Sequence, residues 1–318
     1  MRLPNVRGDG QAVSLASTLP SASIVITTRN RRDEVRTAIE SAVNQTVHPQ
    51  VIVIDDGSTD GTSEMVRARF PHVEVIQHAT SRGYIARRNE GARTAVNHVI
   101  VSIDDDAAFS SPRVVEQALA AFASERVGAV TIPYIDVRRN QRVRQAVQDP
   151  KHLYVVDSYV GTAHAVRRDV FVELGGYRED LVHQGEEMDF CLRLLDAGYV
   201  VGQANADPIH HFESLKRDLG RMDYYGARNA VIFAWRNVPF PFLLVHLPVT
   251  TLRCVLLTLR PHRLVTRLSG VVDGYLDCCT SRREPVSWSA YRLARSLRKN
   301  GPRRLADLDG RLACRQRI

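Results

Sequence analysis

The feature that most constrains the fold is a regular alternation of two kinds of segment in the first third of the chain. Short runs rich in valine and isoleucine, four to six residues long, fit buried strands. Between them, apolar residues recur three or four positions apart, as on one face of a helix. Strands that alternate with helices predict parallel βαβ units with right-handed crossovers. The expected strands are residues 22–27, 51–54, 73–76 and 99–103, and the expected helices are residues 32–47, 59–70 and 84–96.

Beyond residue 110 the alternation becomes less regular. Apolar spacing predicts helices at residues 112–124, 168–174 and 186–197, and strands at residues 128–132 and 161–166. Two polar segments are expected to be loops. The first is arginine-rich and the second carries two histidines: residues 136–150 and 207–214.

The positive charge of the chain is concentrated at one end. The 318 residues carry a net charge of +8 and are 44% hydrophobic, which is enough for a sizeable core. Residues 260–318 hold 14 basic and 5 acidic residues, while the rest holds 29 and 30. Such a basic end fits a solvated helix surface, an anionic membrane or an acidic partner. No basic groove with interleaved aromatics is evident, so a nucleic-acid partner is not expected.

Composition also predicts how the chain is organised. Residues 1–20 lack an apolar core and are expected to be a flexible leader, not a signal peptide. Residues 21–238 form the expected α/β domain, and residues 239–318 a helical, basic C-terminal region. The most apolar stretch, residues 238–259, is interrupted by three prolines and Arg253, so it is too broken to span a bilayer. Five cysteines without a C-x-x-C pair favour a reduced, cytoplasmic protein.

Acidic residues follow two of the expected strands directly. Asp55 and Asp56 come after the second strand, and Asp104, Asp105 and Asp106 come after the fourth. Parallel sheets bind ligands at the carboxyl ends of their strands. A D-x-D at such an end can hold Mg²⁺ against a diphosphate, because hard cations prefer carboxylate oxygens. The structural alternative is an aspartate-rich turn or a helix N-cap.

A second acidic group begins an expected amphipathic helix. Glu186 and Glu187 fall in its first turn, where negative charge suits the helix dipole. One of them could instead take a proton from a hydroxyl as a general base. Asp189 and Arg193 are four residues apart and can simply pair. The pair His210 and His211 is either solvated or offers one more metal ligand.

Taken together, these motifs resemble the family 2 glycosyltransferases of the GT-A fold. The resemblance spans roughly residues 23–239, and the order and spacing of its pieces are specific. It implies a mixed, mostly parallel sheet with flanking helices, a Rossmann-like nucleotide-binding half and a C-terminal helical appendage. The matching pieces are residues 23–30, 41–46, 51–60, 86–91, 104–106, 175–177 and 185–189.

The resemblance implies a nucleotide-sugar donor, carrying UDP, GDP or dTDP, and a Mg²⁺ or Mn²⁺ ion. The implied contacts to the nucleotide or its phosphates are Thr27, Arg29, Asp55, Asp56, Arg82, Arg88, Asp104 and Asp105. The implied metal ligands are Asp104 and Asp106, joined by His211 or its neighbour His210.

The resemblance also implies inverting transfer to an acceptor hydroxyl. Glu187 stands where the family usually has the catalytic aspartate of an E-D pair, with Glu186 and Asp189 as neighbouring candidates. The implied acceptor is a glycan or a lipid-linked intermediate of the cell envelope. The cysteine usage, together with the apolar stretch before residue 260 and the basic end after it, predicts a cytoplasmic protein that is peripheral on the inner face of the plasma membrane.

Two other functions remain open at this point. A sugar-nucleotide pyrophosphorylase also needs an α/β sheet and acidic metal ligands, but it would want a glycine-rich phosphate loop near its first strand. Residues 27–30 are not glycine-rich, and no P-loop pattern occurs. A non-catalytic sugar-nucleotide-binding protein would keep the fold without transfer, and the intact set of acidic residues disfavours it.

Overall fold

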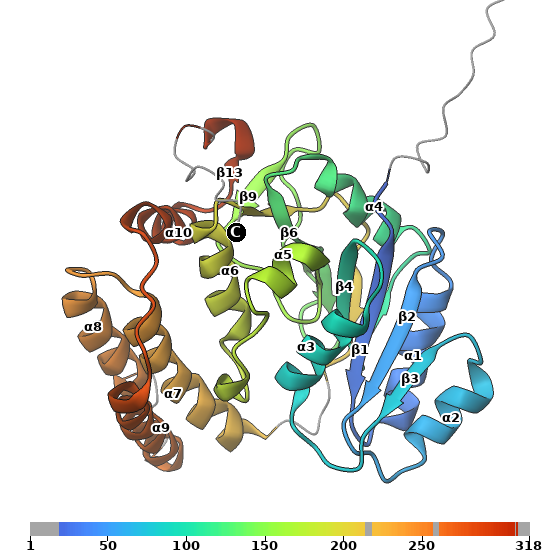
Figure 1. Ribbon diagram of the computed structural model, residues 1–318, viewed down its shortest axis with the longest axis horizontal. Helices are drawn as coiled ribbons and strands as arrows, with labels where there is room; N and C mark the ends of the chain where they lie inside the picture. Colours follow the sequence, from blue (N-terminus) through green and yellow to red (C-terminus); the bar gives the residue numbers. More distant parts are fainter. Residues whose placement is uncertain (1–18, 214–217, 257–260, 309, 311–318) are drawn as a thin grey trace, which may run out of the picture.

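The computed structural model describes residues 19–213, 218–256, 261–308 and 310. A nine-stranded sheet runs through the centre of the protein, with helices on both faces (Figure 1). The strand order is β13-β9-β11-β6-β10-β4-β1-β2-β3. The expected leader lies outside the described residues, except for residues 19 and 20.

The N-terminal half of this sheet is parallel, as predicted. Its strands are β1 (Ala22–Thr28), β2 (Gln50–Asp55), β3 (Glu74–Gln77) and β4 (Val99–Asp104). The connecting helices are α1 (Arg32–Val43), α2 (Thr62–Arg69) and α3 (Tyr84–Thr94). Side chains alternate between the faces of β1: Ile24 and Ile26 pack in the same apolar cluster as α1, whereas Val25 packs in that of α3. Burial on both faces explains why these strands are continuous apolar runs.

The second half of the sheet is mixed. Strand β10 (His164–Arg167) runs antiparallel to both β4 and β6 (Val127–Thr131), and β11 (Val200–Gln203) runs parallel to β6. Next to β11, β9 (Tyr154–Val156) runs antiparallel to it, and β13 (Arg303–Arg304) pairs antiparallel with β9 at the edge. The flanking helices are α4 (Val114–Ala120), α5 (Arg168–Glu173) and α6 (Glu186–Asp196). The predicted mixed α/β class is therefore confirmed.

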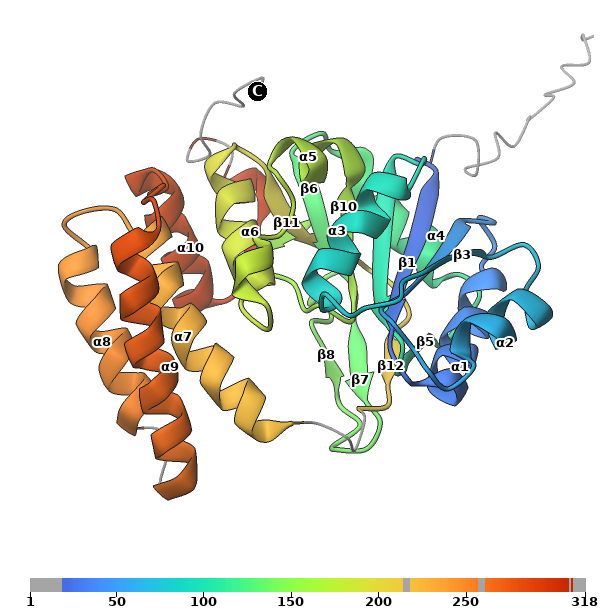
Figure 2. The same ribbon diagram turned by 60° about the horizontal axis from the view of Figure 1, so that its bottom comes forward.

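A second, four-stranded sheet lies below the main one (Figure 2). Its order is β5 (Ala107–Phe109), β12 (Ile209–His211), β7 (Tyr134–Asp136) and β8 (Val143–Arg144). The prediction that residues 207–214 form a loop is wrong, because residues 209–211 form β12. The segment 136–150 likewise contains β8. Strand β12 is defined by partners about 75 and 100 residues away, so local polarity did not reveal it.

Four helices follow the α/β part of the chain: α7 (Leu219–Asn237), α8 (Leu243–Leu256), α9 (Pro261–Thr280) and α10 (Trp288–Asn300). Helices α7 and α9 approach closely at two glycines. A Cβ on Gly270 would lie 2.3 Å from the carbonyl oxygen of Tyr224, and one on Gly274 would lie 2.8 Å from that of Arg228. The predicted C-terminal helices are thus confirmed. None of the helices in the described ranges is both long and apolar enough to cross a bilayer.

Candidate active site

A cavity of about 670 Å³ opens at the carboxyl ends of β1 and β4. Strands, the small sheet, the start of α6 and the start of α7 all contribute to its wall. The sequence-predicted residues that line it are Thr27, Arg29, Asp56, Arg88, Asp104, Asp105, Asp106, Glu187 and His211. The predicted residues that do not line it are Asp55, Arg82, Glu186, Asp189 and His210.

Asp56 organises the loop that enters α3. Its carboxylate accepts hydrogen bonds from the Ser81 hydroxyl, the backbone N–H groups of Arg82 and Gly83, and Arg87 Nε at 2.6 Å. Burial raises the pKa of Asp56, but these hydrogen bonds outweigh burial and lower it below the usual value. Asp56 therefore stands ionised at the cavity edge and fixes the loop that forms one wall.

Asp55 and Arg82 lie outside the cavity lining and bind neighbouring parts of the protein. The fully buried carboxylate of Asp55 accepts bonds from the backbone N–H of Ser58 at 2.8 Å and the hydroxyl of Ser63 at 2.5 Å. Arg82 is exposed and pairs with Glu179 at 3.0 Å. The guanidinium that reaches Asp56 belongs to Arg87, which the sequence analysis missed although it falls within the matching segment 86–91.

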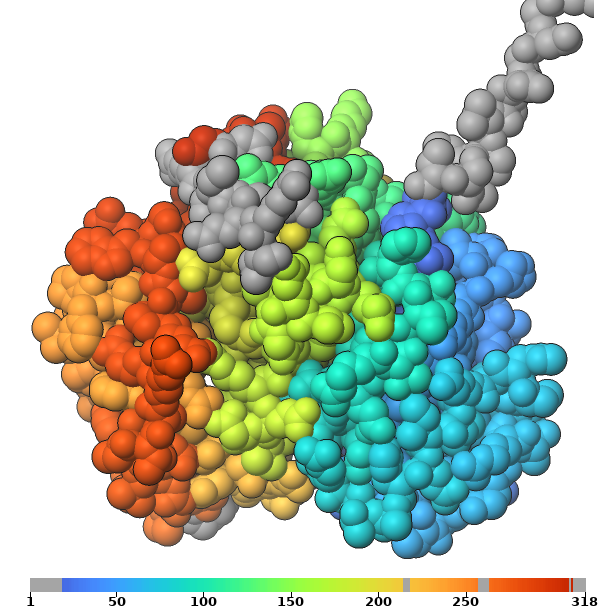
Figure 3. All heavy atoms as spheres, viewed as in Figure 1, coloured from blue at the N-terminus to red at the C-terminus, as the bar shows by residue number. Residues whose placement is uncertain are grey.

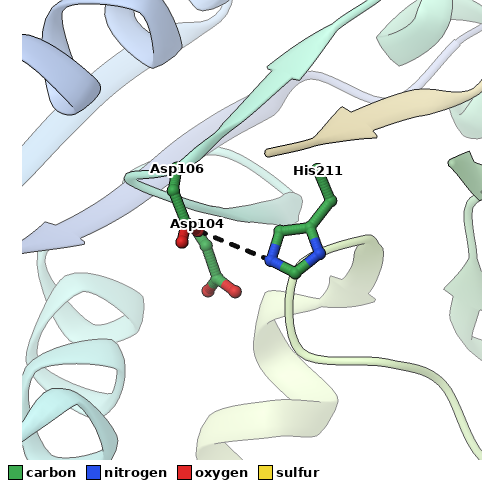
Figure 4. A group of neighbouring side chains, drawn as sticks. All are labelled: Asp104, Asp106 and His211. Atoms are coloured by element: carbon green, nitrogen blue, oxygen red, sulfur yellow. Dashed lines mark ion pairs between the residues drawn. The ribbon is translucent and has the colours of Figure 1, made fainter. Parts of the chain in front are cut away.

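Two carboxylates and an imidazole converge inside the cavity. Asp104, Asp106 and His211 each offer one ligand atom, and these atoms lie within 4.8 Å of one another (Figure 4). Asp104 ends β4, Asp106 follows it, and His211 ends β12. Along β12 successive side chains alternate, so His211 points into the site whereas His210 is not among the lining residues.

This group suits a divalent cation. Carboxylate oxygens with one imidazole are a donor set for Mn²⁺ or Mg²⁺. Asp136 holds His211 Nδ1 at 2.8 Å, which leaves Nε2 toward the aspartates. Burial lowers the pKa of His211, but hydrogen bonds to Asp106 and Asp136 outweigh it and raise the pKa to about 9. A cation at Nε2 would take the place of that proton.

Asp105 lies between Asp104 and Asp106 in the sequence and lines the same cavity, but it is not part of the converging group. It is buried and pairs with Arg31 Nη1 at 2.6 Å, and the same nitrogen lies 3.3 Å from Asp106. Burial raises the pKa of Asp105 to about 7, although Arg31 acts in the opposite direction. Arg31 was not predicted as a site residue, because in the sequence it is one of several arginines that follow β1.

Arg88 links the aspartate group to the start of α6. Its buried guanidinium lies 2.6 Å from Asp104, 3.4 Å from Glu186 and 3.8 Å from Glu187. Burial disfavours the charge of Arg88, but the surrounding carboxylates outweigh burial and raise its pKa. It is thus a fixed cation, flanked by acidic groups from two separate elements.

The three acidic side chains in the first turn of α6 lie in different environments. Glu187 is half-buried and lines the cavity. Glu186 is fully buried, its Oε2 has no hydrogen-bond partner among the residues that the structure describes, and burial together with Glu187 raises its pKa well above the usual range. Asp189 points away and binds Arg178 at 2.7 Å and Arg193 at 3.0 Å. Only Glu187 of these three presents a carboxylate to the cavity.

Helix α7 holds the loop that delivers Glu187. Val182 and Gln184 have positive φ angles of 61° and 67°, which residues other than glycine rarely adopt. The amide nitrogen of Asn229 lies 2.7 to 2.9 Å from the carbonyl oxygens of Leu181, His183 and Gln184. The loop therefore keeps a strained backbone because a side chain from α7 binds it from behind.

A glycine makes room for the charged groups. A Cβ on Gly161 would lie 2.4 Å from Glu187 Oε1 and 2.9 Å from Arg88 Nη1. Gly161 lies just before β10. The need for a glycine there comes from Glu187 and Arg88, which are distant in the sequence. The sequence offered no local signal for it.

The comparisons with known proteins agree with this architecture. The model of the family described as Glycosyl transferase family 2 matches residues 23–175. The chain is 23% identical over 204 residues to glycosyltransferase AglE of Haloferax volcanii, covering 58% of this chain and 64% of that protein. It is 27% identical over 230 residues to a pre-mycofactocin glycosyltransferase of Mycobacterium tuberculosis, covering 65% of this chain and 46% of that protein. The chain thus spans less than two thirds of either relative.

Solved structures share the fold. The mannosyltransferase PcManGT of Pyrobaculum calidifontis, in complex with GDP-Man and Mn²⁺, matches with a TM-score of 0.57 at 18% identity, covering 90% of this chain and 81% of that one. TarS of S. aureus, residues 1–349, matches with a TM-score of 0.59 at 13% identity, covering 80% of each chain. The family match covers the segment that carries β1 to β4 and the aspartate group, so residues 23–175 form a family 2 glycosyltransferase domain.

Proposed function

We propose that this protein is an inverting, metal-dependent glycosyltransferase that moves a sugar from a nucleoside-diphosphate sugar to an acceptor hydroxyl. One observation carries the proposal: a single cavity holds both the group Asp104, Asp106 and His211 and the carboxylate of Glu187. The first group could bind a divalent cation, and the carboxylate of Glu187 could accept a proton. Structural neighbours were solved with GDP-Man and Mn²⁺ and with UDP-GlcNAc, which supports a donor of this class.

The donor would lie with its diphosphate toward the aspartate group. Asp104, Asp106 and His211 would hold Mg²⁺ or Mn²⁺, which when bound offsets the negative charge of the diphosphate leaving group. Arg88 adds a fixed positive charge beside Asp104. Thr27, Arg29 and Asp56 line the part of the cavity at the ends of β1 and β2, where a UDP, GDP or dTDP nucleotide would bind.

Glu187 would act as the general base. Its carboxylate takes the proton of the acceptor hydroxyl while that oxygen bonds to the anomeric carbon from the face opposite the diphosphate. The bond between the anomeric carbon and the diphosphate oxygen breaks, and the configuration inverts. Glu186 is disfavoured as the base because its buried carboxylate does not line the cavity.

The acceptor would be a glycan or a lipid-linked intermediate of the cell envelope. The basic residues after position 260 support binding to an anionic membrane surface on the cytoplasmic side. Each basic side chain near such a surface adds about 1 kcal/mol of attraction. Cell fractionation tests the location: the protein should sediment with membranes at low salt and be released by high salt. Retention in the soluble fraction at low salt would contradict it.

A donor panel tests the activity directly. UDP-, GDP- and dTDP-sugars are incubated with the protein with and without Mn²⁺, and release of nucleoside diphosphate is measured. Transfer predicts diphosphate release that needs the cation and increases with an acceptor. Formation of a nucleoside triphosphate from the donor and pyrophosphate would instead identify a pyrophosphorylase. Donor binding without turnover for every donor and acceptor would identify a non-catalytic binding protein.

A further inference from the structure

Helices α8 and α9 lie at the edge of the molecule that is farthest from β3 (Figure 1, Figure 3), and both carry exposed apolar side chains. The two helices lie side by side, and Thr251 of α8 contacts the hydroxyl of Tyr275 of α9 at 2.7 Å. On α8 the exposed apolar residues are Leu244, Val245, Val249, Leu252 and Leu256. On α9 they are Val265, Leu268, Val272, Tyr275 and Leu276. We call these ten residues the α8–α9 face.

The α8–α9 face is unusual for a surface in water. Its members are 38% to 68% exposed, and they recur three or four positions apart, so they form one stripe along each helix. Among the described side chains of the two helices, Arg253 is the one exposed charge. A contiguous exposed apolar surface of this kind marks a contact with a partner or a membrane.

Negative charge is turned away from this surface. Asp273 of α9 accepts a hydrogen bond from the Tyr224 hydroxyl at 2.6 Å, and Asp277 pairs with Arg228 at 2.7 Å. Both partners belong to α7, on the inner side of α9. The two acidic residues of α9 therefore point toward α7, and the charge of Asp277 is offset by that of Arg228.

Positive charge lies beside the face. Helix α10 contacts the start of α8, where Tyr291 and His246 are 2.6 Å apart and the Arg292 guanidinium lies over the ring of Phe242. Its exposed residues include Trp288 and a row of basic side chains. The exposed basic residues of α10 are Arg292, Arg295, Arg298 and Lys299. An apolar surface with basic neighbours and a tryptophan at its margin is complementary to an anionic bilayer.

Helices α8 and α9 also border a second cavity beside the catalytic one. A second cavity of about 330 Å³ lies between α7, α8 and α9, and Gln184 and Met222 line both cavities. Cys254 of α8 and Arg267 of α9 contribute to its wall. The two helices that carry the α8–α9 face therefore also border a cavity that shares two lining residues with the catalytic cavity.

From this arrangement we propose that the α8–α9 face inserts into the interfacial layer of an anionic membrane, so that the acceptor is a lipid-linked molecule. The proposal rests on the proposed function, and it names both the surface that docks and the class of acceptor. Pairing of two copies through this face is disfavoured, because it would bring Arg253 and the basic rows of both copies together.

Vesicle co-sedimentation of the full chain tests the proposal. The probes are phosphatidylcholine vesicles and vesicles that contain phosphatidylglycerol as well. The wild type should bind the anionic vesicles, and the double variant Leu252→Glu with Val272→Glu should bind at least about tenfold more weakly. Val96→Glu is the matched control, since Val96 is 78% exposed and lies outside the α8–α9 face. It should bind as the wild type does.

A second variant separates charge from insertion. Arg292→Glu with Arg295→Glu should weaken binding to anionic vesicles and leave any binding to neutral vesicles unchanged. Light scattering of each variant reports its oligomeric state, and donor-dependent diphosphate release reports the catalytic site independently. A wild type that remains in the supernatant with anionic vesicles at low salt would overturn the proposal. So would a wild-type dimer that becomes monomeric in the Leu252→Glu, Val272→Glu variant and never binds vesicles.

Discussion

At the scale of single residues, adjacent carboxylates in the cavity differ because their surroundings differ. Glu186 and Glu187 are neighbours in sequence, yet one is sealed in the protein and the other faces the cavity. Asp105 and Asp106 both line the cavity and both lie near Arg31, but of the two only Asp106 belongs to the converging metal-ligand group. Sequence position alone could not assign these roles, since each depends on which way a side chain points.

Exchange of Glu187 for glutamine tests the base. Glu187→Gln keeps the size of the side chain and removes its ability to take a proton, so donor binding should persist while transfer falls at least about 100-fold. Single-turnover transfer and donor affinity are measured separately. Glu186→Gln is the matched control and should turn over near the wild-type rate, because burial already favours a neutral side chain there. The opposite pattern in the two variants would exchange their roles.

Removal of Asp106 tests the metal site. Asp106→Ala deletes one of the three converging ligands, so Mn²⁺-dependent donor binding should be lost while the thermal midpoint changes little. Calorimetric donor titrations with and without Mn²⁺ measure the effect. His210→Ala is the control, because His210 lies outside the cavity. Wild-type turnover in Asp106→Ala, or full activity in excess chelator, would contradict the assignment.

A methyl group at position 161 tests the crowding around Glu187. Gly161→Ala should displace the Glu187 carboxylate or the Arg88 guanidinium, so kcat should fall while the protein remains folded. Gly220→Ala in α7 is the control, since its Cβ would meet nothing closer than 3.4 Å. Alanine favours a helix by up to about 1 kcal/mol over glycine, so this control should not be destabilised. Equal kcat values for both variants would show that the site tolerates the added methyl group.

At the scale of elements, the catalytic part and the helical part are tied together through α6. Asp189 of α6 accepts from Arg178, Arg193 and, at 2.8 Å, from the Asn237 amide at the end of α7. Asn229, also in α7, donates hydrogen bonds to the loop before Glu187. The position of the proposed base therefore depends on a helix that contributes only a few residues to the cavity wall.

Loss of the Asp189 carboxylate should reveal a structural role. Asp189→Ala leaves Arg178 and Arg193 without their shared partner, and breaking such a buried pair costs about 3–5 kcal/mol. Urea denaturation measures the free energy of unfolding. Asp157 is half-buried and pairs with the exposed Arg298 at the surface, so Asp157→Ala serves as the control and should cost less than about 1 kcal/mol. A stable but inactive Asp189→Ala would argue for a direct catalytic role instead.

At the scale of the whole molecule, the sequence predicted the features that repeat locally. Continuous valine and isoleucine runs identified β1 to β4, and the aspartates at their ends identified one side of the cavity. The other side depends on long-range pairing that leaves no periodic pattern. Strand β12, Asp136 behind His211, and Gly161 beside Glu187 all depend on such contacts. The same holds for Arg31 and Arg87, which differ from other arginines only by what lies opposite them.

Strand β13 (Arg303–Arg304) gives this fold an order of assembly. It pairs with β9, so the edge of the main sheet is closed by residues about 150 positions later in the chain. During synthesis, the α/β part therefore emerges with the edge of β9 open, and it stays open until the last helix and β13 have followed. An open strand edge is a template for unwanted pairing with other chains. Protein cut after α7 should thus be prone to aggregation, even though it would retain every residue of the proposed site.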